Sequence, residues 1–153
     1  MYSDSKASGT PGGTVATGSW VTRALNTAAS GNLDGVSTSL SANQVTIQPG
    51  TYVLKTQTPG QGTQRYMCRI NNVTDGVVIT GTSEWSGNST GSNDAAQTKS
   101  YAWWYIQIAS AKTYRVEMQV QSKSGGSSNA LGRAVSTGTS AETYSVLEIF
   151  RLA

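Results

Sequence analysis

The chain has 153 residues and a formal net charge of +3, with only 12% charged residues, so it fits one domain with a core of its own. Histidine, the commonest general base and metal ligand, is absent. Cys68 is the single cysteine, which excludes an internal disulfide. Scattered Lys and Arg residues, no long apolar run and no signal-peptide pattern predict neither a nucleic-acid nor a membrane partner.

The first segment, residues 1–18, has no apolar periodicity and is rich in Ser, Gly and Thr. Such a segment does not offset the entropy lost when it becomes ordered. We therefore predict an extended N-terminal arm over residues 1–18 and a folded domain over residues 19–153. Contact with a neighbouring protein would order the arm; the alternative is that it packs against its own domain.

The remainder predicts strands separated by turns, because β-branched and aromatic residues alternate with polar ones and no long segment carries a helical stripe. Gln48-Pro-Gly50 and Asp75-Gly76 are the clearest turn signals. The expected strands cover residues 20–27, 39–47, 51–58, 64–73, 77–80, 97–108, 113–121, 130–136 and 142–152. Polar loops are expected at 86–96 and 122–129. Strands in this order predict an all-β, antiparallel two-sheet jelly-roll sandwich.

Two strands carry informative patterns. In residues 113–121, the apolar side chains alternate with polar ones and should face the core; they are Tyr114, Val116, Met118 and Val120. In residues 97–108, Trp103 and Tyr105 point away from the side that Trp104 occupies, so the three rings do not form one sugar-binding platform. One side of this strand is expected in the core and the other at an interface.

The closing strand, residues 142–152, is apolar on both faces, with Leu147 and Ile149 on the face opposite Phe150. A half-solvated strand needs only one apolar face, so a second copy of the chain is expected to cover the other. The alternative is a central strand buried within one subunit. Glu148 interrupts the apolar pattern and is expected to pair with an arginine. The candidates are Arg23, Arg69 and Arg151.

No constellation of residues predicts catalysis. The eight carboxylates are spread along the chain without a close acid–base pair, and Cys68 is expected in the core, where it is a poor nucleophile. Asp94 in a polar loop could ligate calcium, although loop polarity explains the composition equally well. We expect a non-enzymatic protein without catalytic residues, cofactor or metal.

Several segments, in their order, resemble the C1q/TNF-like jelly roll of phage virion proteins over roughly residues 19–152. These segments are Ser41-Ala-Asn-Gln-Val-Thr-Ile47, Gln48-Pro-Gly-Thr-Tyr-Val53, Cys68-Arg-Ile-Asn-Asn-Val-Thr-Asp-Gly76, Gly81-Thr-Ser83 and Tyr144-Ser-Val-Leu-Glu-Ile149. The resemblance implies a homotrimer with the closing strand near the three-fold axis. The implied trimer-interface residues are Tyr144, Val146, Leu147, Glu148, Ile149 and Phe150.

Phage tail-fibre relatives carry this domain on a shaft, whereas this sequence shows no heptad, collagen-like or β-helix repeat. That difference favours a capsid decoration, or cement, protein on the virion surface, with the major capsid protein as partner and the arm as attachment. The expected attachment residues are Tyr2, Asp4, Lys6, Pro11 and Val15. The alternative is a tail-fibre tip that binds host-surface glycans through loops such as 86–96. A secreted C1q-like lectin or signalling ligand is disfavoured by the missing signal sequence.

Overall fold

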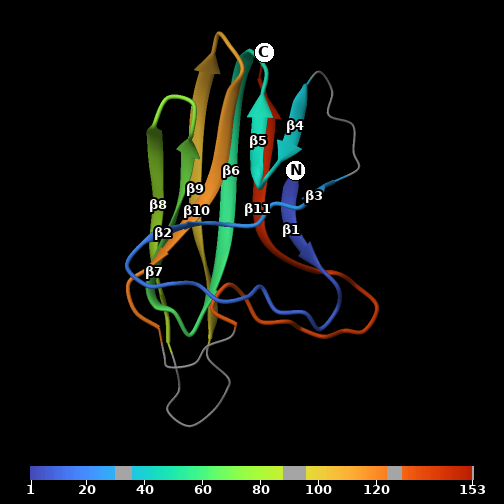
Figure 1. Cartoon of the computed structure of the whole chain (residues 1–153), viewed down its shortest axis with the longest axis vertical. Helices are drawn as coiled ribbons and strands as arrows, with labels where there is room; N and C mark the ends of the chain where they lie inside the picture. The colour runs from blue at the N-terminus through green and yellow to red at the C-terminus, as the bar shows by residue number, and fades with distance from the viewer. Residues whose placement is uncertain (30–35, 88–95, 124–128, 153) are drawn as a thin grey trace.

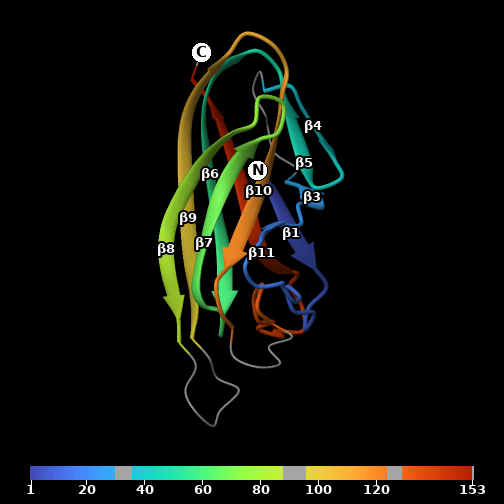
Figure 2. The same cartoon turned by 60° about the vertical axis from the view of Figure 1, so that its left-hand side comes forward.

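The structure is a computed structural model that describes residues 1–29, 36–87, 96–123 and 129–152. Within these residues the chain forms strands and no helix, which confirms the all-β prediction. The strands pack as two antiparallel sheets facing each other in a sandwich (Figures 1 and 2). The two-sheet architecture expected from the sequence is thus present.

The five-stranded sheet has the order β3-β1-β11-β6-β9, and the six-stranded sheet has β4-β5-β10-β7-β8 with β2 beside β10. The first consists of β3 (Thr27–Ala28), β1 (Tyr2–Lys6), β11 (Glu142–Arg151), β6 (Gly50–Gln61) and β9 (Gln97–Ile108). The second consists of β4 (Thr38–Ser41), β5 (Gln44–Ile47), β10 (Lys112–Val120), β7 (Gln64–Asn72), β8 (Val77–Ser86) and β2 (Trp20–Thr22).

The main core lies between the two sheets and takes apolar side chains from both. Leu54, Ile106 and Leu147 from the five-stranded sheet meet Ile70 and Val116 from the six-stranded sheet. The alternation expected in residues 113–121 is confirmed, because the four apolar side chains of β10 are fully buried. Burial of these side chains removes apolar surface from water and is the main force that holds the sheets together.

Two tight turns show how local sequence sets strand pairing. The predicted hairpin at Asp75-Gly76 joins β7 to β8, and Gly76 has a φ of +71°, a value that glycine adopts without strain. The expected single strand at 39–47 is instead two paired strands, β4 and β5. Ala42 and Asn43 turn the chain between them with φ values of 48° and 62°, as a two-residue hairpin requires.

The predicted N-terminal arm is part of the sandwich. Residues 2–6 form β1, which pairs with β11 so that Tyr2 lies opposite Leu147 in the core. The chain then crosses one end of the sandwich beside residues 131–132: Gly12 N donates to Gly132 O at 2.8 Å, and Leu131 N donates to Gly13 O at 3.0 Å. The alternative of packing against its own domain therefore holds. Because Tyr2 is the single large apolar residue of β1, the sequence of this strand shows no apolar periodicity.

The region before β11 also differs from expectation. Residues 130–136, expected as a strand, are irregular, and of residues 20–27 only the first three belong to β2. Arg23 follows β2 and is fully buried between the sheets. Its guanidinium donates to Ser145 Oγ in β11 and, at 2.9 Å, to Leu131 O in the segment before β11, which ties both to the chain after β2. Burial lowers the pKa of Arg23 to about 10.

Candidate assembly surface

Three rows of side chains cross the outer face of the five-stranded sheet, from β11 through β6 to β9. The rows are Phe150–Val53–Tyr105, Glu148–Lys55–Trp103 and Val146–Gln57–Tyr101. Residues opposite each other on neighbouring strands share a face, so the nine side chains lie on one face of the sheet; eight of them are at least partly exposed, and Val146 is buried. We call these nine residues the aromatic face.

The aromatic face leaves large rings open to solvent. Trp103 is 70% exposed, Tyr105 57%, Tyr101 50% and Phe150 46%. Trp104, between two of these rings on β9, points the other way and packs edge-on against Tyr114, with 6.2 Å between ring centroids. The predicted opposite orientation of Trp103 and Trp104 is therefore confirmed. Contiguous exposed rings are common at interaction surfaces, which makes this face the candidate site.

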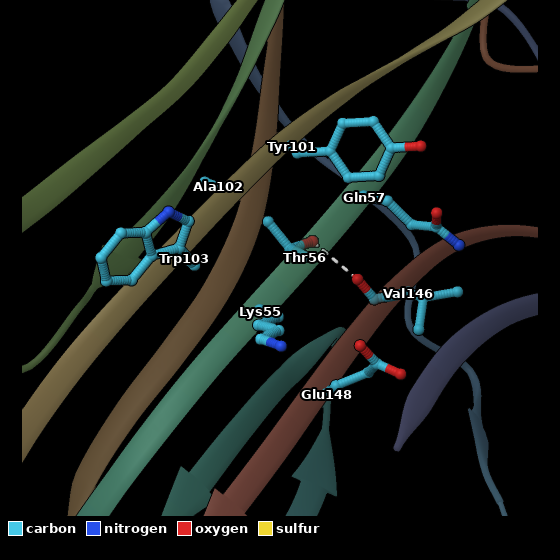
Figure 3. A pocket seen from close by; sticks show the side chains of 8 residues that line it. All are labelled: Lys55, Thr56, Gln57, Tyr101, Ala102, Trp103, Val146 and Glu148. Carbon is cyan, nitrogen blue, oxygen red and sulfur yellow. Dashed lines mark hydrogen bonds between the residues drawn. The ribbon is translucent and has the colours of Figure 1, made fainter.

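A groove of about 260 Å³ runs through the aromatic face (Figure 3). Tyr101 and Trp103 project from β9 at its two sides, and the side chain of Thr56 lies between them in the view. Thr56 Oγ1 donates to the backbone carbonyl of Val146 at 2.7 Å, which ties β6 to β11 beneath the groove. The base of the groove is thus formed by hydrogen-bonded strands, and its sides are formed by aromatic rings.

The aromatic face carries one charge of each sign in its central row. Lys55 and Glu148 are cross-strand neighbours, and Lys55 Nζ lies 5.3 Å from the ring centroid of Phe150. Opposite charges within an apolar surface suit recognition of a partner that repeats the same pattern, because each charge can meet its opposite.

The closing strand contributes less to this surface than the sequence suggested. Leu147 and Ile149 point inward and join the core, and Tyr144 and Val146 are also buried. Of the six residues expected at a trimer interface, Phe150 is exposed and Glu148 is half-buried. Because β11 lies between β1 and β6, its inner face is covered by the sandwich itself, and Leu147 and Ile149 are not available to a second copy.

The aromatic rings of β9 belong to the aromatic face but were not among the interface residues predicted from the sequence. Tyr101, Trp103 and Tyr105 stand at alternate positions, which places them on one side of a strand. That spacing was readable from the sequence. Their position next to Phe150 follows only from the register of β6 between β9 and β11.

The residues expected to attach the arm to a capsid do not form an accessible set. Tyr2, Asp4 and Val15 are buried, while Lys6 and Pro11 are half-buried. Lys6 Nζ lies 3.6 Å from Asp4 Oδ1, and Val15 packs in a second core cluster. These side chains bind their own domain, so attachment through a free arm is not supported.

Around Glu117, the outer face of the six-stranded sheet is polar and internally paired. The carboxylate of Glu117, only 2% exposed, lies between the guanidinium groups of Arg69 and Arg115 and accepts from Asn71 Nδ2 at 3.2 Å. The guanidinium of Arg69 stacks over Trp20, 4.1 Å from the ring centroid. Two of the three arginines considered for Glu148, Arg23 and Arg69, are thus held by other groups.

The described residues contain no group of three or more His, Cys, Asp or Glu side chains placed to hold a metal ion. Cys68 is buried as expected, and burial raises the pKa of its thiol. Asp94, together with most of loops 86–96 and 122–129, lies outside the described residues. In the described parts of the chain, no helix has the length and hydrophobicity to cross a membrane.

Comparison with known proteins gives no match, either to a protein-family model or to a curated protein sequence.

Proposed function

We propose that the chain is a non-enzymatic structural protein that assembles as a homotrimer through the aromatic face. The observation that carries this proposal is the 70% exposure of Trp103 within a contiguous row of rings. A tryptophan at the centre of an apolar surface is the side chain most often responsible for binding energy in protein interfaces. If each copy covers this ring with a different part of the next copy, the head-to-tail contacts close into a ring of three when the rotation between copies is a third of a turn.

The order of the strands supports a jelly roll of the C1q/TNF-like type. The eight strands that remain without β2, β3 and β4 can be counted in chain order. In the five-stranded sheet these strands lie side by side in the order first, eighth, third and sixth. In the six-stranded sheet the order is second, seventh, fourth and fifth. This order is the one expected for a jelly roll built from two Greek keys. Together with the segments that resemble phage virion proteins, it supports a decoration protein bound to the capsid of a phage.

The assembly step is tested by comparing Trp103→Arg with Trp85→Arg, since both tryptophans are exposed but lie on opposite sheets. We expect the wild-type protein to show three times the 16.0 kDa mass of one chain by light scattering. Trp103→Arg should raise the dissociation constant by about 30-fold or more, because hot-spot residues are worth at least about 2 kcal/mol. Trp85→Arg should keep the wild-type mass.

A monomeric wild-type protein at about 100 µM, well above the micromolar range of ordinary associations, would overturn the homotrimer. An unchanged mass for a folded Trp103→Arg variant would place assembly on another surface. Circular dichroism of each variant shows whether the sandwich is intact.

The virion role is tested by antibody labelling of phage particles that contain this chain, viewed by electron microscopy. Labels distributed over the head are expected for a decoration protein. Labels confined to the tail tip would overturn the decoration role and support the receptor-binding alternative.

A further inference from the structure

A second groove lies on the outer face of the six-stranded sheet, far in the fold from the aromatic face. Two rows of side chains define it. They are Gln121–Arg65–Trp85 and Gln119–Met67–Ser83. The groove has a volume of about 430 Å³, which lies within the roughly 300–1,000 Å³ of small-molecule sites. It is therefore large enough for a ligand of a few rings at most.

The walls of this groove combine one open ring with polar groups that are already held in place. Trp85 is 55% exposed, and the guanidinium of Arg65 lies 5.6 Å from its ring centroid. Arg65 Nη1 donates to Gln121 Oε1 at 3.0 Å. Gln119, whose Nε2 donates to Gly18 O at 3.1 Å, is held in the same way. Side chains fixed before binding lose little conformational entropy when a ligand arrives.

We propose that this groove is a saccharide-binding subsite. A sugar ring presents an apolar C–H surface and a rim of hydroxyl groups. The C–H surface matches the indole of Trp85 and the thioether of Met67, and the hydroxyl rim matches planar donors and acceptors such as the remaining N–H groups of Arg65 and the amide of Gln121. A few fixed polar groups around an aromatic wall are the usual composition of a specific small-molecule site.

The charge pattern favours a saccharide over a nucleic acid. Phosphate binding needs several free cations along a track. Among the residues that the structure describes, Arg65 is the one cation that lines this groove, and the neighbouring Arg69 is already paired with Glu117. The polar rim and the modest volume also fit a sugar better than an apolar peptide.

The subsite does not rest on the proposed homotrimer, because it lies on the opposite sheet from the aromatic face. If three copies do assemble through the aromatic face, the grooves stay open to solvent. Three weak subsites on one particle would then bind a glycan surface far more tightly than one does.

The experiment follows the indole N–H signals of the four tryptophans by NMR during titration of the full chain. The probes are glucose, galactose, mannose, N-acetylglucosamine, N-acetylneuraminic acid, maltose and cellobiose, with a single-stranded oligothymidine as a comparison. We expect at least one sugar to move, saturably, the one signal that disappears in Trp85→Ala. Gln121→Ala should weaken that sugar by about 10-fold, as loss of a hydrogen bond worth about 1.4 kcal/mol predicts.

The matched control is Trp103→Ala, which removes an exposed ring from the other sheet. It should leave the sugar-dependent shift unchanged even where it alters the mass of the assembly, so the two proposals fail in different variants. No sugar-dependent shift of the Trp85 signal would overturn the subsite. So would a shift produced by the oligothymidine alone, or an unchanged affinity in Gln121→Ala.

Discussion

The outer faces of the two sheets differ in how their aromatic rings and charged side chains are covered. On the six-stranded sheet, arginines stack on tryptophans and enclose the carboxylate of Glu117, so cations, rings and acid satisfy one another. On the five-stranded sheet, Trp103 and Tyr105 stand open beside a single Lys55–Glu148 pair of neighbours. The outer face of the six-stranded sheet, which we call the arginine-rich face, carries two tryptophans, Trp20 and Trp85, whereas the aromatic face carries one, Trp103.

The two faces therefore differ in composition as well as in the pairing of their rings and charges. A guanidinium over an indole covers the ring with a group that water still solvates, which makes the surface stable without a partner. An uncovered ring retains its unfavourable hydration until another surface removes it. The aromatic face therefore leaves more ring surface uncovered, whereas the part of the arginine-rich face around Trp20 and Glu117 is paired within one chain.

The largest expected effect separates the two sides of β11. Leu147→Ala should lower the free energy of unfolding by about 3 kcal/mol, because it leaves a cavity in the core. Phe150→Ala, on the outer side of the same strand, should change it by less than about 1 kcal/mol while weakening assembly. Urea unfolding followed by fluorescence measures both. Equal losses would contradict the orientation assigned to β11.

A comparison of one acid from each face comes next. Glu117→Ala should cost about 2 kcal/mol of unfolding free energy, since it leaves Arg69 and Arg115 facing each other without a counter-charge. Glu148→Ala is the matched control and should cost less than about 0.5 kcal/mol in the unassembled chain. If Glu148→Ala proves the more damaging at low protein concentration, the arginine-rich face is not the self-sufficient one. Urea titrations at identical pH supply the comparison.

A smaller effect tests the stacking on the arginine-rich face. Arg69→Lys keeps the charge but loses the planar group that stacks over Trp20 while contacting Glu117. We expect a loss of about 1 kcal/mol, measured by thermal unfolding. Arg65→Lys, whose guanidinium lies farther from its ring and is exposed, should change stability by less than about 0.5 kcal/mol. Identical melting temperatures for both variants would show that stacking contributes nothing.

The smallest effect concerns Glu142, a carboxylate that belongs to neither face. It accepts hydrogen bonds from the backbone N–H groups of Ser136 at 2.9 Å, Val135 at 3.1 Å and Gly9 at 3.1 Å. These bonds, that of Ser136 first, hold the pKa of Glu142 below its usual value of 4.5. The charged form is thus favoured in the folded chain. Its contribution to stability is complete above the unfolded pKa and disappears as the pH falls through the lower folded pKa.

Unfolding of the wild-type chain and of Glu142→Gln should therefore differ at neutral pH and converge under acid conditions. Urea titrations across the range below the unfolded pKa of 4.5 measure the convergence. A constant difference at all pH values would show that the carboxylate is not held by these amides. Neither face should change its exposure during this titration.

The elements that could be predicted are those whose signal is local. The alternation of β10 and the turn at Asp75-Gly76 were confirmed, and the expected bounds of β9 coincide with the observed strand. Each of these depends on residues that lie within a few positions of one another. The opposite orientation of Trp103 and Trp104 was predicted for the same reason.

The elements that were missed depend on partners far along the chain. Tyr2 is the only large apolar residue of β1, and it is in the core because Leu147 lies opposite it. No pattern within residues 1–18 reveals this pairing. Leu147 and Ile149 were expected at an interface for the same reason. The sequence of a strand that is apolar on both faces does not show which face packs against the core of its own subunit.

The pairing of β1 with β11 also sets the order in which the two sheets can be completed during synthesis. All strands of the six-stranded sheet have been made once the ribosome has added Val120. The five-stranded sheet still lacks its centre at that moment, because β11 comes last and lies between β1 and β6. Nascent chains therefore carry two unpaired strand edges and no complete aromatic face. Until β11 has been made, Phe150, Glu148 and Val146 are missing from the aromatic face, so any assembly through that face has to follow synthesis of this strand.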